Sequence, residues 1–209
     1  MRFNFGFRYT IQTTGAIIAL LAVPAASLAR AQPSRVAIVI ETEMGSIEAE
    51  IDIARAPVSA ANFLRYVDAG LYDRGVFHRT VKPDNQPNNA VKIEVIQAGP
   101  ASGAKKFPPI PLERTSVTGL SHRDGAISMA RDGPDTATSD FFICIGDQPS
   151  LDFGGKRNPD GQGFAAFGRV TGGMAVVTRI QAQPSDSKQR LTPPIRILKI
   201  ARKRRAGSP

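Results

Sequence analysis

Two stretches near the start of the chain alternate between apolar and polar residues. The apolar positions are Val36, Ile38 and Ile40 in the first stretch, and Ile47, Ala49, Ile51 and Ile53 in the second. A period of two is typical of a strand with one buried face. The two stretches meet near Met44 and Gly45, so the pattern predicts a β-hairpin.

Two other segments have apolar residues at helical spacing. Pro57 opens the sequence PVSAANFLRYVDAG, and Gly70 ends it. Proline in the first turn and glycine just beyond the last are common limits of a helix. The segment GGMAVVTRIQAQ predicts a second, shorter helix that ends before Pro184.

Six further apolar runs predict strands, and the polar and glycine-rich stretches between them predict loops. The runs cover residues 75–81, 91–97, 127–130, 140–146, 164–170 and 193–201. In the last run we expect Ile195, Ile197 and Lys199 on one face. Eight short strands with two helices favour an antiparallel barrel or sandwich with helices attached.

The first 31 residues have the pattern of a secretory signal peptide. Arg2 and Arg8 precede an apolar run at 15–28, and the cleavage site Ala29-Arg30-Ala31 follows. An uncleaved membrane anchor is the alternative interpretation. We therefore expect a signal peptide at 1–31, a folded domain at 32–200 and a basic, disordered tail at 201–209.

The net charge of +9 lies at the two ends of the chain. Three of the 27 basic residues fall in the first 31 positions and six lie from Arg196 onward, which leaves 18 basic residues against 18 acidic ones. A neutral domain body argues against a nucleic-acid partner. The basic end is expected to be a solvated tail, and an acidic envelope polymer is an alternative partner for it.

The sequence gives no sign of a metal site or a bound cofactor. Cys144 is the only cysteine, it lies in the apolar run FFICI, and the chain has two histidines. We expect Cys144 to be a buried, inert thiol. Motifs for nucleotides, zinc, calcium or a serine nucleophile are not found in the sequence, so we expect neither a metal nor a cofactor.

Several separated motifs together resemble the cyclophilins. In order they are FHR at 77–79, IQAG at 96–99, ISMARDGP at 127–134, SDFFICIG at 139–146, and FAAFGRV followed by GMAVV. The resemblance runs from Val36 to Ile200, and the loop at 148–168 is similar to that of a bacterial branch. It implies a mainly β fold, an eight-stranded antiparallel closed β-barrel capped by two α-helices, and isomerisation of the peptide bond before proline.

The chemistry of this reaction explains which side chains it needs. The planar X–Pro bond has a rotation barrier of about 18–20 kcal/mol, and twisting returns the lone pair to the prolyl nitrogen. A fixed cationic donor stabilises that twisted state. The resemblance implies that Arg79 is this donor, that Gln97 binds the substrate backbone, and that Phe142 is the floor of the proline pocket while Phe141 packs in the barrel.

The resemblance also implies substrate contacts, and several of them depart from the family pattern. Ala130 matches the wall for the residue before proline, and Leu151 matches the pocket rim. The remaining candidate contacts stand where the family has other residues: Val95, Arg131, Asp140 and Phe164. Glu94 is expected close to Arg79, where an ion pair would weaken the field of the guanidinium.

The function predicted from the sequence is therefore a prolyl isomerase that assists the folding of exported proteins. Its expected partners are proline-containing polypeptides. We expect a monomer in the periplasm, with no stable membrane insertion after signal cleavage. The alternative is a non-catalytic module that binds proline-containing segments as a chaperone or scaffold.

Overall fold

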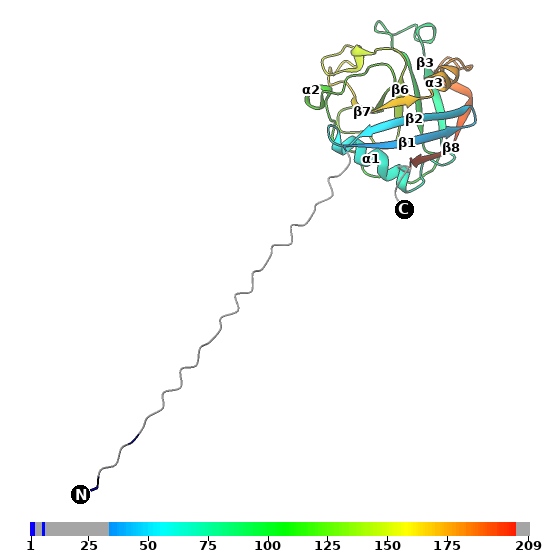
Figure 1. Ribbon diagram of the computed structural model, residues 1–209. Helices are drawn as coiled ribbons and strands as arrows, with labels where there is room; N and C mark the ends of the chain where they lie inside the picture. Colours follow the sequence, from blue (N-terminus) through cyan, green and yellow to red (C-terminus); the bar gives the residue numbers. More distant parts are fainter. Residues whose placement is uncertain (3–5, 7–33, 204–209) are drawn as a thin grey trace. The chain divides into compact units, whose positions relative to one another are not determined.

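The structure is a computed structural model that describes residues 34–203, together with residues 1, 2 and 6 (Figure 1). The predicted signal peptide and residues 204–209 of the predicted tail therefore lie, apart from those three positions, outside the described residues. Residues 34–203 all fall within one compact unit. Within the part of the chain that is described, no helix is long and apolar enough to cross a membrane.

Eight antiparallel strands close into a barrel, in the order β1-β2-β7-β5-β6-β4-β3-β8. The strands are β1 (Arg35–Thr42), β2 (Gly45–Asp52), β3 (Val76–Val81), β4 (Val95–Gly99), β5 (Ala126–Met129), β6 (Phe141–Cys144), β7 (Ala165–Gly172) and β8 (Arg190–Arg202). The predicted hairpin is confirmed, because Thr42 pairs with Gly45 across a two-residue turn. The predicted closed barrel is confirmed as well.

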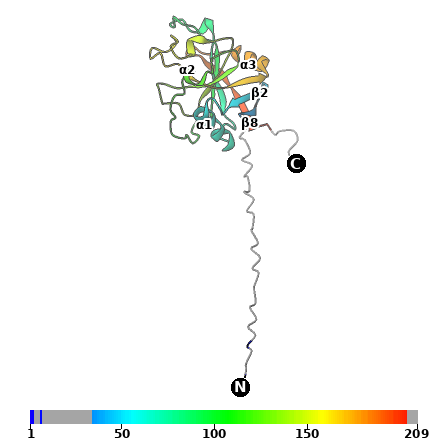
Figure 2. The same ribbon diagram turned by 60° about the vertical axis from the view of Figure 1, so that its left-hand side comes forward.

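Two longer helices accompany the barrel, as the sequence predicts. Helix α1 (Pro57–Asp68) has proline at its first position, and α3 (Met174–Gln181) ends before Pro184. The two helices lie on opposite sides of the barrel in both views (Figures 1 and 2). The pattern misses three short elements: α2 (Thr115–Thr118) and the 3-10 turns η1 (Pro83–Asn85) and η2 (Pro149–Leu151).

The barrel interior is a continuous apolar core centred on aromatic rings. Phe63 of α1 packs edge-on against Phe141 of β6, with ring centroids 5.3 Å apart and an interplanar angle of 85°. Phe167 of β7 and Tyr72 lie 5.1 and 5.3 Å from the same Phe63 ring. All of these rings are fully buried. This aromatic packing fixes the Phe141 side chain of β6 in the barrel interior.

The predicted strand at 91–97 is wrong in its first half, because β4 begins only at Val95. The side chain of Gln86 bonds both backbone groups of Ile93: its amide donates to the carbonyl at 2.7 Å, and its oxygen accepts the N–H at 3.3 Å. The Gln86 side chain thus supplies the hydrogen bonds that a neighbouring strand would otherwise make with Ile93. Residues 91–94 form a loop beside the barrel.

The last strand also departs from its prediction. Lys199 is exposed, whereas Ile195, Ile197 and Ile200 are buried. A bulge causes this shift, because Glu41 pairs with Lys199 while Thr42 pairs with Ile197. The strand continues to Arg202, whose guanidinium pairs with Asp68, so residues 201 and 202 belong to the barrel rather than to a tail.

Candidate active site

One cavity of about 350 Å³ opens on the outer face of neighbouring barrel strands. All nine of the site residues that the sequence predicts line it: Arg79, Val95, Gln97, Ala130, Arg131, Asp140, Phe142, Leu151 and Phe164. The lining residues that the sequence does not predict are Ile93, Lys106, Asp132, Thr136, Thr138, Arg157 and Asn158. Residues spread over much of the chain therefore meet at one place.

The register of the sheet places the three predicted catalytic residues in a row. Arg79 on β3 stands opposite Gln97 on β4, and Gln97 stands opposite Phe142 on β6. Residues in register across neighbouring strands lie on the same face of a sheet. The row therefore presents a cation, an amide and an aromatic ring side by side to the cavity.

Arg79 is held by two glutamine side chains. Its Nη1 donates to Oε1 of Gln97 at 3.1 Å, and its Nε and Nη2 donate to Oε1 of Gln189 at 3.1 and 2.6 Å. Gln189 is anchored in turn, because its amide donates to the carbonyl of Asn85 at 3.0 Å. Burial lowers the pKa of Arg79, but a guanidinium remains charged in proteins.

Gln189 is a supporting residue that the sequence alone does not reveal. It lies 110 positions beyond Arg79, and only the pairing of β3 with β8 brings the two together. Its backbone has a φ of 66°, the left-handed conformation of a tight turn. No motif of the sequence marks this position.

The expected ion pair between Glu94 and Arg79 is wrong. The carboxylate of Glu94 accepts a hydrogen bond of 2.9 Å from the side-chain amide of Gln181, at the end of α3. Within residues 34–203, every hydrogen-bond acceptor of the Arg79 guanidinium is a neutral amide oxygen. The charge of Arg79 is therefore not neutralised by Glu94.

Phe142 forms the apolar floor of the cavity. It is 5 % exposed and packs in a small cluster with Val95 and Leu151, separate from the barrel interior. Phe164 meets the Phe142 ring edge-on, with centroids 5.3 Å apart and an angle of 88°. The two neighbouring phenylalanines of β6 thus serve different clusters, Phe141 the interior and Phe142 the cavity.

His122 supports this floor from behind. Its ring stacks on Phe142, with centroids 5.9 Å apart and an angle of 14°. Its Nδ1 lies 2.7 Å from a carboxylate oxygen of Asp152, and its Nε2 lies 2.9 Å from the hydroxyl of Ser128. His122 lies in a loop, as predicted. Its side chain is buried and packs against Phe142 on the side away from the cavity.

The pKa of Asp152 is lowered in the folded protein. Burial on its own raises this pKa, and the hydrogen bonds from the side chain and backbone of His122 outweigh that effect. The carboxylate is therefore ionised and accepts the hydrogen of Nδ1. This contact fixes the orientation of the His122 imidazole, which stacks against the Phe142 ring.

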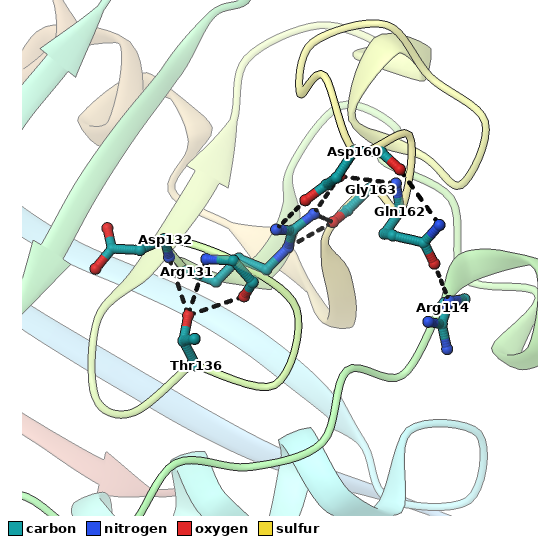
Figure 3. Close-up of polar contacts among 8 residues, drawn as sticks. Arg114, Arg131, Asp132, Thr136, Asp160, Gln162 and Gly163 are labelled. Carbon is teal, nitrogen blue, oxygen red and sulfur yellow. Dashed lines mark hydrogen bonds and ion pairs between the residues drawn. The ribbon is translucent and has the colours of Figure 1, made fainter.

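Arg131 directs its guanidinium toward Asp160 and Gly163 of the loop at 152–163 (Figure 3). Its two terminal nitrogens donate to the two carboxylate oxygens of Asp160 at 2.8 and 3.0 Å, and its Nε donates to the carbonyl of Gly163 at 2.8 Å. The side chain is 1 % exposed. Arg131 thus lines the cavity and also fixes this loop through its contacts with Asp160 and Gly163.

Glycine is required where the loop returns to the sheet. Gly163 has a φ of +66°, and a Cβ atom there would lie 2.6 Å from the backbone of Asp152. The next residue, Phe164, donates its backbone N–H to Leu151 at 2.9 Å. The loop therefore closes tightly and sets both apolar side chains against Phe142.

Asp140 lines the cavity beside Ala130, whose backbone N–H donates to the carbonyl of Asp140 at 2.8 Å. One of its oxygens lies 3.7 Å from Nε2 of His78, and the other accepts a hydrogen bond of 3.2 Å from the hydroxyl of Ser139. The side chains of Asp140 and Arg131 thus have different polar partners. Residues 34–203 contain no cluster of three ligands able to hold a metal ion.

Comparison with known proteins agrees with this architecture. A family model described as cyclophilin type peptidyl-prolyl cis-trans isomerase/CLD matches residues 37–202. The chain is 34% identical over 168 residues to the peptidyl-prolyl cis-trans isomerase A of Dickeya dadantii, covering 79% of this chain and 81% of that protein. It is 34% identical over 163 residues to the peptidyl-prolyl cis-trans isomerase-like 1 of Neurospora crassa, covering 78% and 91%.

A solved structure has the same fold. The crystal structure of a cyclophilin type peptidyl-prolyl cis-trans isomerase from Cryptosporidium parvum aligns with a TM-score of 0.62 and 22% identity, over 82% of this chain and 99% of that one. The same protein was also solved in the presence of the dipeptide Ala-Pro, with a TM-score of 0.60. The chain belongs to the cyclophilin type peptidyl-prolyl cis-trans isomerase family.

Proposed function

We propose that this chain is an exported peptidyl-prolyl cis-trans isomerase that speeds rotation about X–Pro bonds in polypeptides folding in the periplasm. The row of Arg79, Gln97 and Phe142 around one cavity carries the proposal. The isomerase names of the relatives and the Ala-Pro dipeptide of the Cryptosporidium protein support it.

The apolar side of the cavity suits a proline ring. Phe142 supplies the floor, and Leu151 and Phe164 supply walls, with little exposed surface on the first two. Burial of a proline ring against this surface gives binding free energy without any bond to the reacting amide. That binding holds the prolyl nitrogen at a fixed place beside Arg79.

Gln97 is set up to bind the substrate backbone. Its side-chain oxygen accepts from Arg79, which fixes the orientation of the amide. Its NH₂ group then points away from Arg79 and can donate to a substrate carbonyl. The hydrogen bond of 3.1 Å between Arg79 and Gln97 therefore orients both the guanidinium and the amide toward one bound peptide.

Arg79 supplies the catalytic charge in this mechanism. In the planar amide the nitrogen lone pair is delocalised, and in the twisted amide it returns to nitrogen and can accept a hydrogen bond. Nη1 and Nη2 each carry a second N–H for which residues 34–203 provide no acceptor. A donor that interacts with the twisted amide more strongly than with the planar one lowers the barrier.

The isomerase assay compares wild type with Arg79→Ala on an Ala-Pro peptide, by protease-coupled detection or NMR exchange. We expect acceleration by the wild type that is largely lost in the variant. A wild-type protein that binds the peptide without accelerating its exchange would instead support the alternative, a binding module for proline-containing segments.

The export part of the proposal rests on the N-terminal sequence. It predicts that cells making the full chain release a form beginning at Gln32 into the periplasm. Fractionation followed by N-terminal sequencing tests this. A membrane-bound protein that keeps residues 1–31 would contradict cleavage and favour the anchor. The neutral charge of the domain body argues against a nucleic-acid partner. We also propose a monomer that binds proline-containing polypeptides, since the sequence contains no repeat or heptad pattern.

A further inference from the structure

We propose that Arg157 selects substrates that carry a carboxylate on the residue after the proline. This inference rests on the proposed function and names its substrate class. Arg157 lies in the loop at 152–163 and lines the cavity. Family resemblance gives it no role, and the sequence does not mark it as a site residue.

Arg157 is held rigidly at the cavity by neutral groups. Its Nη1 donates to Oε1 of Gln86 at 2.8 Å and to the carbonyl of Val91 at 2.6 Å. Its backbone N–H donates to the carbonyl of Ser150 at 3.1 Å. These contacts leave Nε and Nη2 without an acceptor among residues 34–203, so the free donors can meet a ligand.

The neighbourhood of Arg157 is short of negative charge. Arg79 lines the same cavity, and the side-chain acceptors of both guanidiniums are neutral oxygens. The pKa of Arg157 is lowered by burial and by the charge of Arg79. Two cations of one cavity that have no ion-pair partner among residues 34–203 favour a ligand that brings a negative charge.

The lining of the cavity carries four cations and two carboxylates. Arg131 is paired with Asp160. Lys106 lines the cavity together with Asp132 and Asp140. The lining therefore has an excess of positive charge, and within residues 34–203 the guanidiniums of Arg79 and Arg157 contact only neutral acceptors. In the proposed mechanism Arg79 donates to the prolyl amide, so Arg157 is the guanidinium that can pair with a substrate side chain.

The strand register indicates which substrate residue meets Arg157. Ala130 lies at one end of the cavity, where its N–H donates to the carbonyl of Asp140 at 2.8 Å. Phe142 of β6 lies two residues after Asp140 in the chain. Two residues further on, Cys144 pairs with Val95 of β4. The chain before Val95 leads to Val91, the partner of Arg157. Arg157 therefore lies at the end opposite Ala130.

This order fixes the direction of a bound peptide. The residue before proline is assigned to the wall at Ala130, and the proline to the floor at Phe142. The residue after proline then extends toward Ile93 and Arg157. A glutamate or aspartate there brings its carboxylate to the free donors of the guanidinium.

The test uses the full chain and three peptides, Ala-Ala-Pro-Xaa-Ala with Xaa as Glu, Gln or Lys, followed by NMR exchange at low salt. We expect kcat/KM to fall in the order Glu, Gln, Lys, with about fivefold between Glu and Lys, as for a partly exposed ion pair. The difference should shrink at high salt. Equal values for the three peptides would overturn the proposal without any variant.

The variants separate selection from a structural role. Arg157→Gln, which keeps a donor for Val91, should remove the Glu-to-Lys difference and leave the Gln peptide within about twofold. Arg157→Glu should reverse the order. Arg202→Gln removes an equal charge from the distant pair with Asp68 and should leave the order unchanged. An order that persists in Arg157→Gln, or an equal loss on all three peptides, would overturn selection by Arg157.

A failure of the proposed function can be told apart from a failure of this inference. If the wild type accelerates none of the peptides, the isomerase proposal fails. The same peptides are then titrated by NMR chemical shift, and the order of their Kd values decides the role of Arg157. Tighter binding of the Glu peptide that is lost in Arg157→Gln supports it, and equal Kd values contradict it.

Discussion

The two faces of strand β6 belong to two different environments. Phe141 points into the barrel, where it meets the rings of Phe63, Tyr72 and Phe77 edge-on. Phe142 points outward into a small cluster that borders a cavity with charged walls. One residue of the strand therefore holds the fold together, and the next one is available to a ligand.

The difference between the faces lies in what completes each of them. The interior is completed mainly by regular elements, the strands with α1 and α3, whose apolar side chains are close-packed. The outer face is completed by loops, and each loop is fixed by polar contacts such as the Arg131–Asp160 pair and the Gln86–Ile93 bonds. The candidate site thus combines three residues on regular strands, Arg79, Gln97 and Phe142, with loops that polar contacts hold in place.

The largest expected effect comes from exchanging the two phenylalanines for alanine. Phe141→Ala leaves a cavity in a closed core and should lower the free energy of unfolding by about 3–5 kcal/mol. Phe142→Ala opens space toward the solvent-filled cavity, so we expect a smaller loss of about 1–3 kcal/mol. Denaturant unfolding measures both, and equal losses would mean that the two faces are not distinct in packing.

The next largest effect tests the support beneath the floor. His122→Ala removes the ring stacked on Phe142 and leaves Ser128 and Asp152 without their buried partner. We expect a loss of about 2–3 kcal/mol in stability and a higher KM with a smaller change in kcat, because Arg79 is untouched. A loss confined to kcat would contradict a purely positioning role for His122.

The smallest effect is the pH dependence contributed by Asp152. Its folded pKa lies below its ordinary value of 3.8, so its stabilisation is complete above that pH and is lost as the pH falls through the lower folded value. Wild type and Asp152→Asn should therefore differ by a constant amount, under about 1 kcal/mol, from pH 5 to 7. The difference should shrink below pH 4. A difference that grows on acidification would contradict the sign.

The sequence predicts the barrel interior better than the cavity. Alternation and helical spacing locate the hairpin, α1, α3 and most strands, because burial on one face leaves a period in the sequence. These patterns fail where a side-chain contact or a bulge interrupts the regular pairing of strands. Ile93 is bonded by the side chain of Gln86 instead of a strand, and a bulge in β8 turns Lys199 outward.

The site itself is predictable only in part. The family motifs identify all nine predicted residues that line the cavity. They do not identify Gln189, His122 or Arg157, which come from a turn and two loops. These three act through contacts between distant segments, and neither a motif nor a period records such contacts.

The measurement that tests the central claim most directly separates binding from rotation in Arg79→Ala. NMR exchange on an Ala-Pro peptide, at concentrations that span saturation, gives the Kd and the exchange rate of the bound peptide. If Arg79 stabilises the twisted amide, the bound-state exchange rate should fall by at least about tenfold, equivalent to about 1.4 kcal/mol, with little change in Kd. A bound-state rate equal to that of the wild type would contradict the role of Arg79.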